Sequence, residues 1–89
     1  MNLVSSIVLL IQDNEVNYNL YMNPDGNGYF FKPVVYMSRN VVPPSFWVYK
    51  KGSAWNFEGF VEKEIRGQAI DEISFYLDYS TTDLSAIND

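Results

Sequence analysis

The chain has 89 residues, of which 47% are hydrophobic and 17% aromatic, and its formal net charge is −5. This length fits one domain, and the apolar content excludes a chain that is disordered by composition. There is no histidine and no cysteine, which excludes disulfide frameworks, zinc sites built on thiolate or imidazole, and Ser-His-Asp or Cys-His catalysis.

The first segment, residues 3–12, is almost entirely apolar and shows no clear period. It fits either a helix or a strand that is buried on both faces. Its apolar run of about nine residues is much shorter than the about 20 that a membrane span needs, and no basic residues precede it as in a signal peptide. We therefore expect it in the core of a cytoplasmic protein without membrane association.

Residues 16–22 alternate between apolar and polar side chains, which predicts a half-buried strand. The next segment, 23–28, carries Asp-Gly and Asn-Gly pairs and is typical of a hairpin turn. Its spacing resembles the start of an EF-hand loop, but Val34 occupies the position where that loop needs a bidentate carboxylate. Residues 29–37 then predict the return strand, with Pro33 at a bulge or at an unpaired edge.

A second hairpin is predicted from residues 46–50 and 54–60, after a connection at 40–45 that two prolines stiffen. Alternation puts Phe46, Val48, Trp55 and Phe57 on one face, and Trp47, Tyr49 and Phe60 on the other. One helix covers only one face, so some large aromatic side chains need another cover. Three candidates are the N-terminal segment, a partner chain, and a ligand that stacks on aromatic rings, such as a sugar or a base.

Residues 61–78 predict a helix, because apolar residues recur every four positions, namely Val61, Ile65, Ala69, Ile73 and Leu77. Phe75 falls outside this apolar stripe. An alternating pattern over 73–79 leaves a strand open as the alternative. Residues 80–89 turn polar, and we expect a frayed tail there.

These elements predict one α+β domain over residues 1–89. It consists of an antiparallel sheet of four to five strands, arranged as two hairpins, with a C-terminal amphipathic helix on one face. The N-terminal segment completes the domain as a helix or as a fifth strand. The alternative fold is a small all-β sandwich or barrel.

Charge is unevenly distributed along the chain. Residues 1–57 hold three acids and four bases, a net of +1, whereas residues 58–89 hold eight acids and two bases, a net of −6. Such an acidic third repels phosphate, so we expect no nucleic-acid partner, and it attracts a basic protein. In size and charge alone, the chain is similar to bacteriocin and toxin immunity proteins and to phage-encoded inhibitors.

We therefore expect a non-enzymatic protein-interaction module of the inhibitor or immunity type that binds a basic partner protein. The candidate partner-binding residues are Glu62, Glu64, Asp71, Glu72, Phe75 and Tyr76. Catalysis has only carboxylates, lysines and tyrosines to draw on, and the adjacent Asp71 and Glu72 point about 100° apart on a helix. We expect no enzyme activity, cofactor or metal.

Two alternatives belong to other classes. The first is a small module that binds a carbohydrate or a similar ligand through an exposed aromatic face, with Trp47, Tyr49 and Phe60 as the candidate residues. The second is a structural subunit that associates with itself, as a homodimer. Ionic strength separates charge pairing from stacking, because salt screens the former far more strongly.

Overall fold

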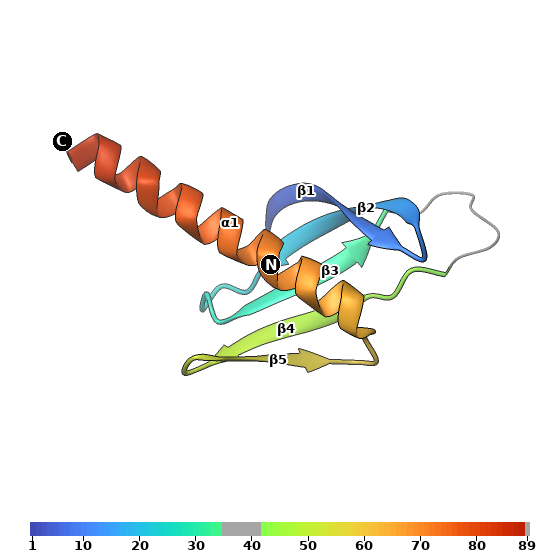
Figure 1. The fold of residues 1–89 in the computed structure, drawn as a ribbon. Helices are drawn as coiled ribbons and strands as arrows, with labels where there is room; N and C mark the ends of the chain where they lie inside the picture. Colours follow the sequence, from blue (N-terminus) through green and yellow to red (C-terminus); the bar gives the residue numbers. More distant parts are fainter. Residues whose placement is uncertain (35–41, 89) are drawn as a thin grey trace.

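The structure, a computed structural model, describes residues 1–34 and 42–88, with side chains as far as Leu77. The elements are β1 (Asn2–Ile11), β2 (Asn14–Met22), β3 (Gly28–Pro33), β4 (Phe46–Lys51), β5 (Ala54–Glu58) and α1 (Lys63–Asn88). The strands form one antiparallel sheet in sequence order, and α1 crosses one face of it (Figure 1). The α+β class is confirmed. The all-β alternative is wrong, because β1 and β5 are the free edges of an open sheet beside a helix.

The N-terminal segment is a strand rather than a helix. Its turn to β2 consists of Gln12 and Asp13, both with positive φ (50° and 65°), as a tight hairpin of the right twist requires. Leu9 is fully buried under the helix, whereas Val8 and Leu10 on the opposite face are about half exposed. The segment therefore extends the sheet at its edge, and the hypothesis that it covers the second face is wrong.

The core lies between α1 and one face of the sheet. Tyr18, Phe31 and Phe46 are its largest fully buried side chains, and the rings of Phe31 and Phe46 stack 4.8 Å apart. The Tyr18 hydroxyl donates a hydrogen bond of 2.8 Å to the carbonyl of Pro44, so its burial leaves no unsatisfied donor. As predicted, Trp55 and Phe57 share this face with Phe46 and Val48.

Pro33 is the last residue of β3, at a position where its nitrogen has no neighbouring strand to donate a hydrogen bond to. The β3–β4 ladder stops at Phe31 opposite Phe46, whereas the β2–β3 ladder continues to Pro33. Val34 donates its N–H to the carbonyl of Asn17 on β2, so the nitrogen of Pro33 faces away from β2, beyond the end of β4. Its missing N–H therefore costs no ladder hydrogen bond. Residues 35–37 of the predicted return strand lie outside the described residues.

Helix α1 packs on the sheet through Ile65, Ala69 and Ile73, which are all buried, as the four-residue spacing predicted. The ends of the predicted stripe differ, because Val61 is buried but precedes α1 and Leu77 is 37% exposed. Phe75 lies off this stripe and is 70% exposed. The helix continues to Asn88, beyond the predicted end at residue 78, and extends past the sheet (Figure 1). That residues 80–89 fray stays a prediction. Within the described residues, no helix combines the length and apolar character that crossing a membrane requires.

One side chain ties the helix to the free edge of β1. The Gln68 amide accepts a hydrogen bond from the Leu10 N–H (2.7 Å) and donates one to the Leu10 carbonyl (2.9 Å). Leu10 lies opposite Glu15 at a non-hydrogen-bonded position of the β1–β2 ladder, so its N–H and carbonyl point away from β2. The Gln68 side chain therefore makes the two hydrogen bonds that a residue of a neighbouring strand would make, and it holds α1 at this edge.

We expect Ile73→Asp to lower the free energy of unfolding by about 3–4 kcal/mol, since it buries an unpaired carboxylate in the core. Chemical denaturation monitored by circular dichroism measures the loss. The matched control is Ser74→Asp at the next, exposed position, which should change stability by less than about 0.5 kcal/mol. Equal effects of the two variants would mean that Ile73 faces water.

We expect Gln68→Ala to speed hydrogen exchange at the Leu10 amide about tenfold, which corresponds to about 1.4 kcal/mol of lost protection. NMR-detected exchange measures this directly. Gln68→Glu keeps an acceptor for the Leu10 N–H and should retain more protection than the alanine variant. Unchanged exchange in Gln68→Ala would show that this hydrogen bond does not hold the edge in solution.

Candidate functional site

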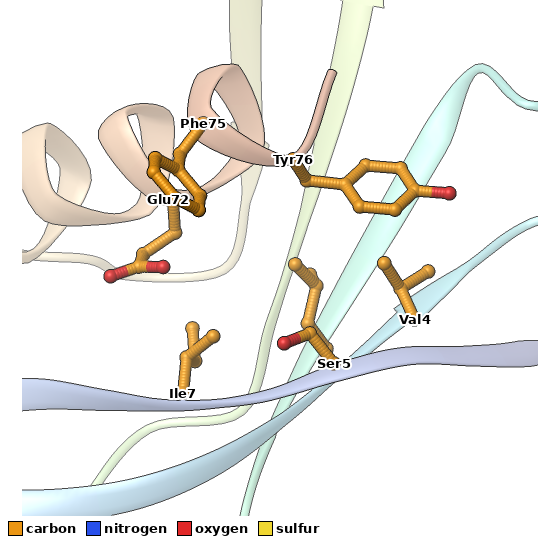
Figure 2. A pocket seen from close by; sticks show the side chains of 7 residues that line it. Val4, Ser5, Ile7, Glu72, Phe75 and Tyr76 are labelled. Atoms are coloured by element: carbon orange, nitrogen blue, oxygen red, sulfur yellow. The ribbon is translucent and has the colours of Figure 1, made fainter. Parts of the chain in front are cut away.

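A cavity of about 300 Å³ opens between α1 and β1, and we call it the α1–β1 cleft. Its lining residues are Val4, Ser5, Ile7 and Leu20 from the sheet, and Glu72, Phe75 and Tyr76 from the helix. Figure 2 shows Glu72 and Phe75 above Ile7, with the Tyr76 ring extended above Val4. The cleft is therefore an apolar site with one carboxylate at its wall.

An irregularity in β1 shapes the β1 wall of the cleft. The register between β1 and β2 shifts between Leu3 and Ser5, so that Val4 is an extra residue at a β-bulge. A bulge bends the strand and re-aims its side chains, and here Val4 and Ser5 both line the cleft. The small side chain of Ser5 leaves space that a larger residue would fill.

The helix wall of the cleft contains half of the predicted partner-binding residues. Glu72 and Tyr76 are half-buried, and Phe75 projects with 70% of its surface exposed. A large aromatic side chain this exposed is a typical anchor of a protein interface. The spacing of these residues on the helix was visible in the sequence, whereas the β1 wall that completes the cleft was not.

Among the described side chains of α1, the acidic ones lie on the side that faces β1. Gln68 contacts β1, and residues three or four positions away share its side of a helix. Glu64 and Asp71 are at these positions, and Glu72 follows inside the cleft. Strand β1 itself carries no charged residue. The surroundings of the cleft are therefore acidic, with no basic side chain on β1 to offset them.

Basic residues lie on the opposite side of the helix. The Arg66 guanidinium is 6.0 Å from the centre of the Phe57 ring, and Lys63 and Arg66 line an open groove beside Trp55 and Phe57. Lys50 lies 5.4 Å from the Trp55 ring. Charge is thus separated across α1, with acids toward β1 and bases toward β5.

Glu62 is not part of the cleft. It precedes α1, where its carbonyl accepts the N–H of Arg66 (3.0 Å). Its side chain lines a separate cavity near Phe60 and Pro44. The structure thus brings Glu72, Phe75 and Tyr76 together, puts Glu64 and Asp71 on the adjoining helix surface, and separates Glu62 from all of them.

The second face of the sheet carries a group of aromatic rings, Tyr21, Phe30, Trp47 and Tyr49, which we call the aromatic platform. Neighbouring ring centres are 6.4 Å apart for Tyr21 and Phe30, 4.8 Å for Phe30 and Trp47, and 5.8 Å for Trp47 and Tyr49. The last two rings are inclined by only 10°. The platform spans β2, β3 and β4.

Two of the three predicted aromatic-face residues belong to the platform. Phe60 does not, because β5 ends at Glu58 and Gly59 turns the chain with a φ of 106°. Tyr21 and Phe30 were missed, although alternation with the apolar Leu20 already puts Tyr21 on the second face. That Phe30 lies opposite Tyr21 depends on the register of β2 and β3.

Gly28 makes room for the platform. It pairs with Tyr49 across β3 and β4. A Cβ atom at this position would lie 2.9 Å from Cε1 of Tyr49 and 2.8 Å from Nδ2 of Asn23. The absent side chain therefore lets the Tyr49 ring lie over the backbone of β3, as aromatic residues do across from strand glycines.

Tyr29 lies on the helix side of the sheet and is almost fully buried. Burial raises the pKa of its hydroxyl above 10.0, and the nearby Tyr76 raises this pKa further. Ionisation of Tyr29 would place a phenolate in the core beside the cleft.

Among the side chains that the structure describes, no three acidic groups come together as a metal site would need. Comparison with protein-family models, with curated proteins and with solved structures finds no match for this chain. What the cleft offers chemically is apolar contact, one carboxylate and a surrounding negative field.

We expect the free energy of unfolding to fall as the pH rises through the raised pKa of Tyr29. The folded state holds this proton more tightly than the unfolded state, so its contribution is complete below pH 10.0 and is lost above the folded pKa. Denaturation at about pH 9 and about pH 11 should show a smaller loss for Tyr29→Phe than for the wild type. Equal losses would show that Tyr29 does not control this alkaline transition.

Proposed function

We propose that this protein is a non-enzymatic binding module of the inhibitor or immunity type, and that it engages a basic partner protein at the α1–β1 cleft. The observation that carries the proposal is the convergence of an exposed aromatic anchor, an apolar cavity and acidic side chains at one place. Interfaces of this kind need a few buried anchors for affinity and charges for steering.

The apolar part of the site supplies affinity. Phe75 and Tyr76 stand on the helix wall, and Val4 and Ile7 form the opposite wall. The volume of about 300 Å³ is at the small end for ligand pockets, and fits one or two side chains of a partner. An aliphatic side chain that enters the cleft would cover the exposed ring of Phe75.

The acidic part supplies orientation and speed. Glu72 stands in the wall of the cleft, and Asp71 and Glu64 follow on the adjoining helix surface. These carboxylates would accept lysine or arginine side chains of the partner on the helix side of the inserted aliphatic residue. Each exposed ion pair is worth about 1 kcal/mol or less, so affinity depends on the apolar anchor. The charges accelerate encounter with a basic protein, and salt weakens this effect.

An unbiased peptide selection tests the proposal and needs no candidate partner. Random peptides displayed on phage are selected against the immobilised protein, at low and at high salt. The proposal predicts enrichment of sequences in which an aliphatic residue neighbours lysine or arginine, and loss of this enrichment on a Phe75→Ser protein. Enrichment of acidic sequences, or of sequences that bind Phe75→Ser equally well, would reject it.

We expect the triple variant Glu64→Lys, Asp71→Lys, Glu72→Lys to slow association with a selected basic peptide by about tenfold or more at low salt, with little effect on folding. The matched control reverses three exposed acids away from the cleft, Glu15, Glu58 and Glu62, and changes the net charge equally. Surface plasmon resonance measures both on-rates. Equal slowing by the two triples would mean that net charge alone steers binding and that the cleft is not the site.

A further inference from the structure

The second face of the sheet carries the aromatic platform and has no element of this chain over it among the described residues. Helix α1 covers the opposite face (Figure 1), and β1 lies within the sheet. Besides the aromatic platform, the face carries Leu3, Val8 and Leu10 of β1, which are 58%, 46% and 52% exposed. A polar row of Ser6, Asn19 and Lys32 separates Val8 and Leu10 from the platform, so the exposed apolar surface forms two patches. Exposed apolar patches of this kind mark an interaction site.

We propose that this face is the interface of a homodimer in which two sheets pack face to face. One row of the sheet runs across all five strands through Leu3, Tyr21, Phe30, Trp47 and Glu58. Its aromatic rings would form the centre of the interface, where rings of two inner faces interdigitate at about 10 Å between sheets.

The charges on this face suit a second copy of the same chain. By strand alternation Lys32 and Lys51 share the platform face, and so do Glu58, opposite Trp47, and Glu15. All four are exposed, and they are the charged residues of this face among the described strand residues. A surface that carries both signs in equal number can complement itself across a twofold axis, which a surface of one sign cannot.

The distribution of the other acids points to the same face. Glu64, Asp71 and Glu72 lie on α1, on the far side of the sheet from the platform. Pairing through the helix would bring six carboxylates of two copies together. Pairing through the platform leaves these acids on the outside of the dimer, where their repulsion is screened by water and salt.

The size of the face sets the expected strength. Four inter-strand spacings of about 4.8 Å and about six residues of shared strand length give a face of roughly 20 Å by 20 Å. Side chains stand out from it, so the buried area exceeds the roughly 400 Å² of its projection, against about 800 Å² per partner in a standard interface. We therefore expect a dimer that dissociates at micromolar concentrations. It is independent of the partner-binding proposal, because the cleft lies on the other face.

Sedimentation equilibrium of the full chain from about 5 to about 500 µM tests the dimer across this range. The wild type should shift from the monomer mass to the dimer mass. Leu3→Lys, at an exposed edge position, and Trp47→Gln, at the centre, should each weaken the dimer at least tenfold. The matched control is Phe75→Lys, an exposed apolar residue changed in the same way on the helix, which should dimerise like the wild type.

Tryptophan fluorescence locates the interface in the same samples. Trp55→Phe leaves Trp47 of the platform as the single reporter, and its emission should shift to the blue and resist iodide quenching as concentration rises. Trp47→Phe leaves only Trp55 on the helix side, and its emission should not change with concentration. Circular dichroism of every variant checks that the fold is retained.

Three outcomes would overturn the proposal. The first is a monomer mass at the highest concentration with Trp47 open to iodide. The second is a dimer that Phe75→Lys weakens and that Leu3→Lys and Trp47→Gln do not, since the interface would then involve the helix. The third is a monomer in which soluble oligosaccharides protect Trp47, because the platform would then be a stacking surface for sugars.

Discussion

A single helix must cover a sheet that has two faces, and most features of this molecule follow from that constraint. The helix buries one face through Ile65, Ala69 and Ile73. On the other face, four aromatic residues pack against one another, and no helix of the described chain covers them. A chain of this size buries a small core. The largest side chains of that core, such as Tyr18 and Phe31, lie on the face that the helix covers.

The position of the helix decides where the candidate binding site lies. Gln68 holds α1 against the outer edge of β1 through both polar groups of Leu10. One to two turns further on, Glu72 and Tyr76 line a cavity together with Val4, the extra residue of the bulge in β1. The α1–β1 cleft is the result. An edge strand is usually a liability for aggregation, and here the same helix protects part of that edge and creates a site beside the rest.

Charge and apolar surface are arranged in complementary ways on the two faces. On the helix side, the described acids of α1 lie toward β1 and its bases lie toward β5, so the one carboxylate of the cleft is Glu72 and the basic groove is on the other side. On the platform side, two lysines and two glutamates are exposed among the described residues. The two proposed interactions therefore use different physics, since steering by charge serves an unlike partner and balanced charge serves a like one. Both surfaces are available at the same time, because the sheet separates them.

The sequence by itself determined those elements in which apolar residues recur at one clear spacing. Alternation identified β2 and the faces of β4 and β5, and the four-residue spacing identified α1 with Ile73 in the core. The first segment stayed ambiguous because β1 is apolar on both faces, and periodicity does not separate such a strand from a buried helix. Its turn was also missed, because Gln12 and Asp13 adopt positive φ without a glycine to signal it.

Tertiary structure decided what depends on residues far apart in the chain. The helix wall of the cleft is readable from local spacing, but Val4 and Ile7 join Phe75 and Tyr76 only through packing across the whole chain. Likewise, Trp47 and Tyr49 follow from alternation, whereas strand register adds Phe30 and Tyr21 and the end of β5 removes Phe60. Local propensity and periodicity are properties of neighbouring residues. Register, crossing position and the side on which a helix lands are set by burial of the whole chain, which no single segment encodes.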